Sequence, residues 1–205
     1  FAPAMKKAGF DHIIIQGRAA TPVYLHITEE AVTLRDASHL WGKTIPDAEA
    51  ILKKELADPQ AQIALIGPAG ENLVYTACVS HRYNVAGRTG MGAVMGSKNL
   101  KAVCVSGRSK IAIAHPEAFA RERKNWLKKI SENPFTKFFG TFGSAGPLDK
   151  EDESGLLAVK NFSQAGGFEG VEKVSAGNLK KFFTRSHACF ACPVHCIQSF
   201  EVTDG

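Results

Sequence analysis

Three cysteines gathered near the end of the sequence constrain this chain more than any other feature. They read Cys189-Phe-Ala-Cys192-Pro-Val-His-Cys196, whereas Cys78 and Cys104 stand alone in apolar stretches. An odd number of cysteines, three of them within one short segment, favours metal binding over disulfide bonding. We expect the two isolated cysteines to be inert thiols in the core, since free cysteine packs as a small hydrophobe.

The spacing of the three clustered cysteines favours an iron–sulfur cluster over zinc. Spacers of two and three residues let each thiolate reach a different iron of a cubane, while structural zinc usually takes two knuckles separated by a dozen or more residues. No second knuckle is visible, although His187 and His195 lie nearby. We predict that Cys189, Cys192 and Cys196 bind a [4Fe–4S] cluster, with zinc or unliganded thiols as alternatives. The two histidines are predicted to lie near the cluster without binding it, and the fourth ligand is expected outside these residues.

Composition excludes several classes of protein. Of the 205 residues 44% are hydrophobic and 22% are charged, which is typical of a globular chain and not of a disordered one. No apolar run approaches the roughly 18 residues of a membrane helix. The net charge of +5 is mild and its bases are dispersed. We therefore expect no membrane and no nucleic acid, and the small basic excess suits a small acidic protein partner.

Hydrophobic patterning divides the chain near residue 110. The first part is predicted to be rich in strands, with one helix over 46–57 that begins in a capping box at Thr44 and Asp47. Its strands are expected at 11–16, 23–27, 32–34, 61–66, 73–80 and 100–106. After Gly107 the pattern becomes helical, with one helix opening at 115–117 and a last one over 176–186. The predicted fold class is α+β, with a β-rich domain over 1–110 and the start of a mainly α-helical domain over 111–205.

A glycine-rich segment over 87–98 is the second candidate site. Its four glycines, together with Arg88 and Lys98, suit a loop whose backbone amides approach phosphate. The spacing matches neither a P-loop nor a dinucleotide-binding turn. We predict a phosphate- or pyrophosphate-binding loop of a less common kind, with a purely structural glycine turn as the alternative.

Several segments together resemble the aldehyde:ferredoxin oxidoreductase family. The resemblance is carried by 36–42, 66–73, 86–102 and the cysteine motif, and it runs through essentially the whole chain. It implies a cytoplasmic enzyme that holds tungsten, sometimes molybdenum, between two pyranopterins beside one [4Fe–4S] cluster. Such enzymes oxidise aldehydes to carboxylic acids and pass electrons to ferredoxin.

The resemblance also assigns roles to individual residues. It implies that 1–110 is the rear part of the pterin-binding domain, and that Asn84, Val85, Gly87 and Arg88 lie in the stretch that contacts pterin. The backbone carbonyl of Val85 would bind the Mg²⁺ that bridges the two pterin phosphates. The sequence departs from the family at Asn84, Val85 and Thr89, where members often have Arg, Ala and Gly. The chain is interpreted as an internal fragment, and the resemblance implies that the catalytic acid–base residues lie outside these 205 residues.

The expected function is aldehyde oxidation in an oligomeric enzyme, with ferredoxin or another iron–sulfur electron-transfer subunit as partner. One alternative is the catalytic subunit of a tungsten-dependent benzoyl-CoA reductase, a related branch that acts on an acyl-CoA. A second is an electron-transfer iron–sulfur subunit without active tungsten. A zinc-bound interaction module is a third, and it leaves the glycine-rich segment without a role.

Overall fold

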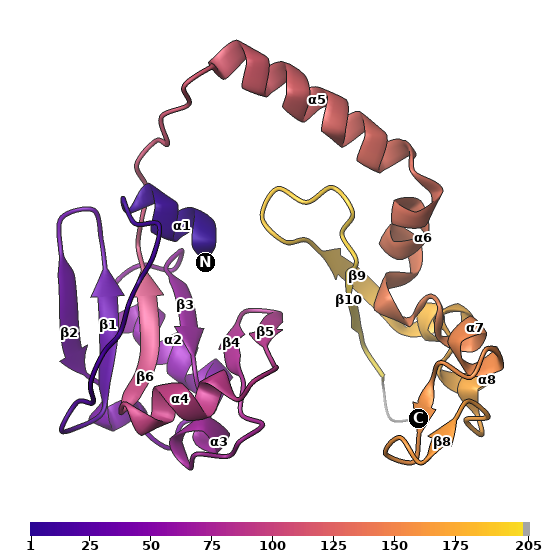
Figure 1. The fold of residues 1–205 in the computed structure, drawn as a ribbon, viewed down its shortest axis with the longest axis horizontal. Helices are drawn as coiled ribbons and strands as arrows, with labels where there is room; N and C mark the ends of the chain where they lie inside the picture. Colours follow the sequence, from indigo (N-terminus) through magenta and orange to yellow (C-terminus); the bar gives the residue numbers. More distant parts are fainter. Residues whose placement is uncertain (203–205) are drawn as a thin grey trace. The chain divides into compact units, whose positions relative to one another are not determined.

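The computed structural model describes residues 1–202, and the chain divides into two compact units, residues 1–112 and residues 113 onward (Figure 1). Helices and a multi-stranded sheet occur in the first unit, and helices with two short β-hairpins occur in the second. The fold class is α+β, as the sequence predicted. Within the described residues, no helix is both long and apolar enough to span a bilayer.

A mixed six-stranded sheet forms the centre of the first unit. Its strands are β1 (Val23–Ile27), β2 (Val32–Asp36), β3 (Gln62–Leu65), β4 (Val79–His81), β5 (Asn84–Ala86) and β6 (Leu100–Val105). Their order is β2-β1-β6-β3-β4-β5, in which β1 and β6 are parallel and every other pair is antiparallel. Strand β6, the last of these six strands along the chain, therefore lies inside the sheet, and β5 lies at its edge.

Helices cover both faces of this sheet. They are α1 (Ala2–Lys7), the short 3-10 helix η1 (Ser38–Leu40), α2 (Ile45–Glu55), α3 (Pro68–Glu71) and α4 (Met91–Ser97). On one face Tyr24 and Cys104 pack with Leu52 of α2. On the other face Val103 packs in a cluster that includes Met95 of α4. All six residues of β6 are buried, which is why this strand reads as an almost continuous apolar run.

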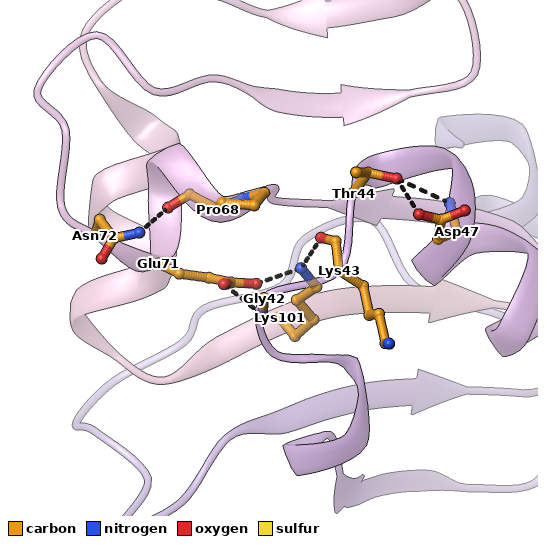
Figure 2. A network of polar contacts seen from close by, with 8 residues as sticks. All are labelled: Gly42, Lys43, Thr44, Asp47, Pro68, Glu71, Asn72 and Lys101. Atoms are coloured by element: carbon orange, nitrogen blue, oxygen red, sulfur yellow. Dashed lines mark hydrogen bonds and ion pairs between the residues drawn. The ribbon is translucent and has the colours of Figure 1, made fainter.

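A buried ion pair interrupts the apolar run of β6 (Figure 2). The side chains of Lys101 and Glu71 are 0% and 3% exposed and are in direct contact. The Lys101 ammonium also donates to the Lys43 carbonyl at 3.1 Å, and the Glu71 carboxylate accepts the Gly42 N–H at 2.7 Å. Burying a charge is tolerated only when it is paired and hydrogen-bonded, and both conditions are met here. The pair joins β6, α3 and the turn before α2.

Many of the predicted elements of the first unit are confirmed. The hairpin at β1 and β2, the strands near 61–66 and 100–106 and the helix predicted over 46–57 are all present. That helix begins at Ile45, and the side-chain oxygen of Thr44 accepts the backbone N–H of Asp47 at 3.4 Å, as the capping box predicted. Helices α3 and α4 and the short strand β5 were not predicted.

Two predicted strands of the first unit are wrong. Residues 11–16 form no strand, and Ile14 is 84% exposed, because β-branched residues form a strand only where a partner strand is available. The strand predicted over 73–80 begins only at Val79. Before it the chain turns, with Leu73 in the left-handed region (φ 58°) and the Val74 N–H bonded to the Ala69 carbonyl at 2.9 Å. Local turn bonds to α3 replace the ladder bonds that a strand would need.

The second unit contains one long helix followed by short elements. These are α5 (Pro116–Glu132), α6 (Pro134–Phe142), η2 (Gly143–Ala145), α7 (Leu148–Glu153), β7 (Ala158–Val159), β8 (Gln164–Ala165), α8 (Val171–Val174), α9 (Ala176–Leu179), η3 (Lys180–Phe182), β9 (Phe183–His187) and β10 (Ile197–Phe200). The helix predicted to open at 115–117 is confirmed as α5. Within residues 113–202 no apolar side chain is fully buried.

The helix predicted over 176–186 is wrong beyond residue 182. Helical structure ends with η3, and Phe183 begins strand β9. Strand β9 pairs antiparallel with β10, so that His187 lies opposite Ile197. Pairing with a strand farther along the chain overrides the helical spacing of the apolar residues.

We expect the buried ion pair to be essential for the stability of the first unit. The substitution Lys101→Met should lower the free energy of unfolding by about 3–5 kcal/mol, because it leaves the Glu71 carboxylate buried without its partner. Hydrogen-exchange protection of the β6 amides in urea measures this loss.

Lys6→Met is the matched control for this prediction. It breaks an ion pair with Asp11 whose side chains are 51% and 62% exposed, and such pairs contribute little to stability. Equal protection of β6 in the two variants would show that the buried pair is not a major source of stability.

Candidate functional site

The three clustered cysteines lie in the turn that joins β9 to β10 (Figure 1). The antiparallel pairing of these strands brings the two ends of the turn together next to His187 and Ile197. The imidazole Nε2 of His187 is 2.8 Å from the Ser199 hydroxyl across the two strands. The hairpin therefore presents all three thiols on a single loop of backbone.

Left-handed residues shape this cysteine turn. Ala191 (φ 53°) and His195 (φ 56°) each directly precede a cysteine, and the Cys192 N–H donates to the Cys189 carbonyl at 3.1 Å. Residues other than glycine seldom adopt this conformation, which costs about 1–2 kcal/mol. Turns of this kind can gather backbone N–H groups into a concave surface that suits anions, including iron–sulfur clusters.

The exposure of the three thiols differs along the turn. Cys189 is exposed, whereas Cys192 and Cys196 are partly buried. The thiols do not converge on a single ion, since residues 1–202 contain no group of three or more His, Cys, Asp or Glu side chains placed to hold one. The donor set nevertheless fits a [4Fe–4S] cluster, because each thiolate of a cubane binds a different iron. The cluster assignment itself stays a prediction.

The two isolated cysteines differ from each other. Cys104 lies in β6 with no exposed surface, and burial raises the pKa of its thiol to about 12, so it stays neutral and unreactive. The prediction of a core thiol is confirmed for Cys104. Cys78 is partly buried and lies just before β4 rather than inside a strand.

The glycine-rich segment contains a helix that the sequence analysis missed. Helix α4 begins after Gly90, which adopts the left-handed conformation, and it packs on α3. A Cβ atom added at Gly96 would lie 1.9 Å from the Gly70 carbonyl oxygen, and one at Gly92 would lie 2.6 Å from the Cys78 carbonyl oxygen. Gly92 and Gly96 therefore have a structural role, because only glycine leaves room for this close packing. The spacing of two glycines four residues apart was the signal for this close packing.

The residues predicted to contact pterin lie at the edge of the sheet. Asn84 and Val85 belong to the exposed edge strand β5, and Gly87 and Arg88 follow it directly. Opposite Asn84 lies His81, and burial lowers the pKa of this imidazole to about 4, so it is neutral at pH 7. The four residues thus form one continuous, solvent-facing stretch of chain.

The chemistry of this stretch fits a phosphate group. Arg88 is exposed, and none of the ion pairs formed by residues 1–202 involves its guanidinium. At Gly87 an added Cβ would meet only the Val85 side chain, at an ordinary 3.5 Å, so the backbone there is open to a ligand. An exposed guanidinium beside an exposed, glycine-containing stretch of backbone is suitable for binding phosphate.

Comparison with known proteins identifies the family. Residues 1–107 match the profile described as "Aldehyde ferredoxin oxidoreductase, N-terminal domain", and residues 121–205 match "Aldehyde ferredoxin oxidoreductase, domains 2 & 3". The chain belongs to the aldehyde ferredoxin oxidoreductase family, which confirms the resemblance that the sequence motifs indicated.

Several relatives are similar along nearly the whole chain. The tungsten-containing aldehyde ferredoxin oxidoreductase of Pyrococcus furiosus is 38% identical over 198 residues, which cover 96% of this chain and 33% of the relative. That of Pyrococcus abyssi is 41% identical over 199 residues, with the same two coverages. The "Aliphatic sulfonate oxidoreductase, WOR-like subunit" of Pyrococcus furiosus is 34% identical over 215 residues, covering 95% of this chain and 33% of that protein. The chain spans about a third of the length of these curated relatives.

A solved structure shares the fold. It is described as "Active site complex BamBC of Benzoyl Coenzyme A reductase in complex with 1,5 Dienoyl-CoA". The likeness has a TM-score of 0.77 at 32% sequence identity, and it covers 98% of this chain and 32% of that one.

We expect the packing role of Gly96 to appear in stability measurements. The substitution Gly96→Ala should lower the free energy of unfolding by about 1–3 kcal/mol, because the clash with the Gly70 carbonyl outweighs the intrinsic helix preference of alanine. Thermal unfolding of the full chain measures the effect.

Gly87→Ala is the control from the same segment. Its added Cβ meets only an ordinary contact, so the change in stability should stay within about 0.5 kcal/mol. A larger loss at Gly87 than at Gly96 would contradict the assignment of packing to the helix and of an open backbone to the loop.

Proposed function

We propose that this chain is part of a tungsten-containing enzyme that oxidises aldehydes to carboxylic acids and passes the electrons to ferredoxin. The main support is the similarity to relatives named tungsten-containing aldehyde ferredoxin oxidoreductase, at 38–41% identity over nearly the whole chain. The cysteine turn adds support, because it offers a cubane ligand set in the second unit.

The proposal gives each unit a cofactor. Cys189, Cys192 and Cys196 would hold the [4Fe–4S] cluster, with the fourth ligand outside the described residues. The amides after β5 and the Arg88 guanidinium would hold a pterin phosphate, and the Val85 carbonyl, a hard oxygen ligand, would bind Mg²⁺. A bound tungsten bis-pyranopterin supplies two-electron chemistry, while the cluster supplies single-electron transfer. The residues of this chain would position the cluster and the pterin and would provide the hydrogen bonds and charges around them.

The proposal also covers location and partners. We propose a cytoplasmic, oligomeric enzyme whose electron acceptor is ferredoxin or another iron–sulfur subunit. The small basic excess of the chain suits an acidic carrier of this kind.

A second candidate function is reduction of an acyl-CoA. It is favoured by the likeness to the benzoyl-CoA reductase complex, which was solved with 1,5 Dienoyl-CoA. The two candidates predict different substrates for the intact enzyme. Reduction of ferredoxin by an aldehyde panel supports the first, whereas turnover of benzoyl-CoA with no aldehyde activity would replace it by the second.

The experiment that tests the cofactor set is metal and acid-labile sulfide analysis of the intact source protein. We expect about one tungsten, four irons and four sulfides per chain. Iron and sulfide without tungsten or molybdenum would favour the electron-transfer alternative. Zinc as the only metal would contradict the proposal.

Replacement of one predicted ligand tests the cluster assignment. Cys192→Ser in the full-length protein should abolish the EPR signal of the reduced cluster and electron delivery to ferredoxin, since serine is a poor substitute for a thiolate ligand of iron. Cys78→Ser is the control, because Cys78 lies in the other unit and should leave the signal intact. An unchanged signal in Cys192→Ser would remove Cys192 from the ligand set.

A further inference from the structure

The cysteine turn and strand β10 contact α6 and η2 at three alternate residues, two in the turn and one in β10. The carbonyl of Val194 lies against Gly140, and the carbonyl of Cys196 lies against Gly143. Two residues farther on, the side-chain amide of Gln198 donates to the Thr141 carbonyl at 2.9 Å. The second half of the turn is therefore held along its backbone by another segment of the same unit.

Glycine is required at both backbone contacts. A Cβ atom at Gly140 would lie 2.7 Å from the Val194 oxygen, and one at Gly143 would lie 2.9 Å from the Cys196 oxygen. Gly143 also has φ 64° and ψ −161°, a region of backbone conformation that only glycine populates. Any other residue at these two positions would push the cysteine turn away from α6 and η2.

Side-chain packing does not replace these contacts. A cavity of about 190 Å³ lies beside them, lined by the ends of α5 and α6 and by Pro193 and Val194 of the turn. Within residues 113–202 no apolar side chain is fully buried, so no apolar core fixes the turn. Close backbone contact at the two glycines, together with the Gln198 bond, holds this part of the turn against α6 and η2.

We propose that Gly140 and Gly143 are positioning residues for the iron–sulfur cluster, acting through the backbone of Val194 and Cys196. By fixing the Cys196 carbonyl they fix the direction of the Cys196 side chain and the exposure of its thiolate. Hydrogen bonds to cluster sulfur and solvent exposure tune the reduction potential of such clusters. Moving this backbone should therefore change the potential at which the cluster accepts electrons. This inference depends on the cluster assignment proposed above.

The test is the substitution Gly140→Ala in the full-length enzyme. We expect a shifted midpoint potential and an altered EPR line shape of the cluster, with partial loss of iron and sulfide. In the cluster-free protein, alkylation of Cys196 should change in rate more than alkylation of Cys189, because the Gly140 contact is with Val194, which lies two residues before Cys196 and five residues after Cys189. The matched control is Gly177→Ala, since an added Cβ at Gly177 meets no atom within 4 Å.

A second variant weakens the same contact without adding an atom. Gln198→Ala removes the bond to the Thr141 carbonyl and should change the midpoint potential and line shape in the same way, but less. This variant decides the question if Gly140→Ala does not fold.

The possible outcomes separate this inference from the proposed function. A wild-type enzyme without iron and sulfide overturns both. A wild-type cluster that keeps its potential and line shape in the folded variants, even with a lower melting temperature, shows that the glycines are merely structural and overturns this inference alone.

Discussion

The contact between the Lys101 ammonium and the Glu71 carboxylate sets the arrangement of the first unit, because neither charge could remain out of water alone. It fixes α3 against β6, and α4 packs on α3 where Gly70 and Gly96 approach closely. Helix α4 begins at Met91, three residues after Arg88. The ion pair in the interior of the unit is thus linked, through α3 and α4, to the segment that carries Arg88.

Close backbone contacts shape the cysteine turn of the second unit. Its cysteine turn obtains its shape from left-handed residues at Ala191 and His195, and its attachment from glycines of α6 and η2. The left-handed residues and the glycine contacts both determine where the backbone carbonyls and N–H groups of the turn lie. Such control of backbone groups would suit the proposed [4Fe–4S] site, because backbone N–H groups can donate hydrogen bonds to cluster sulfur.

Sequence reasoning worked best where the signal was local and chemical. The Thr44 cap and the apolar strand β6 could be read directly, and family motifs identified the fold. The cluster inferred from the spacing of the cysteines stays a prediction. Reasoning failed where a segment depends on a distant partner. The apolar residues at 13–15 have no strand beside them, while Phe183 joins a strand because β10 is available. The packing of Gly96 on α3 was missed because glycine-rich segments suggest a ligand before they suggest a neighbouring helix. Whether Asn84 and Val85 contact pterin stays a prediction.

The central place of β6 has a consequence for synthesis on the ribosome. Strand β6 is the last of the six to be made, yet it pairs with β1 on one side and β3 on the other. Until residue 105 has emerged, the β1–β2 hairpin and the β3–β4–β5 strands lack the strand that joins them. Parallel pairing over such a long separation in sequence is slow to form. The nascent chain must therefore keep two incomplete pieces of sheet, each with an unpaired edge, from aggregating until the joining strand arrives.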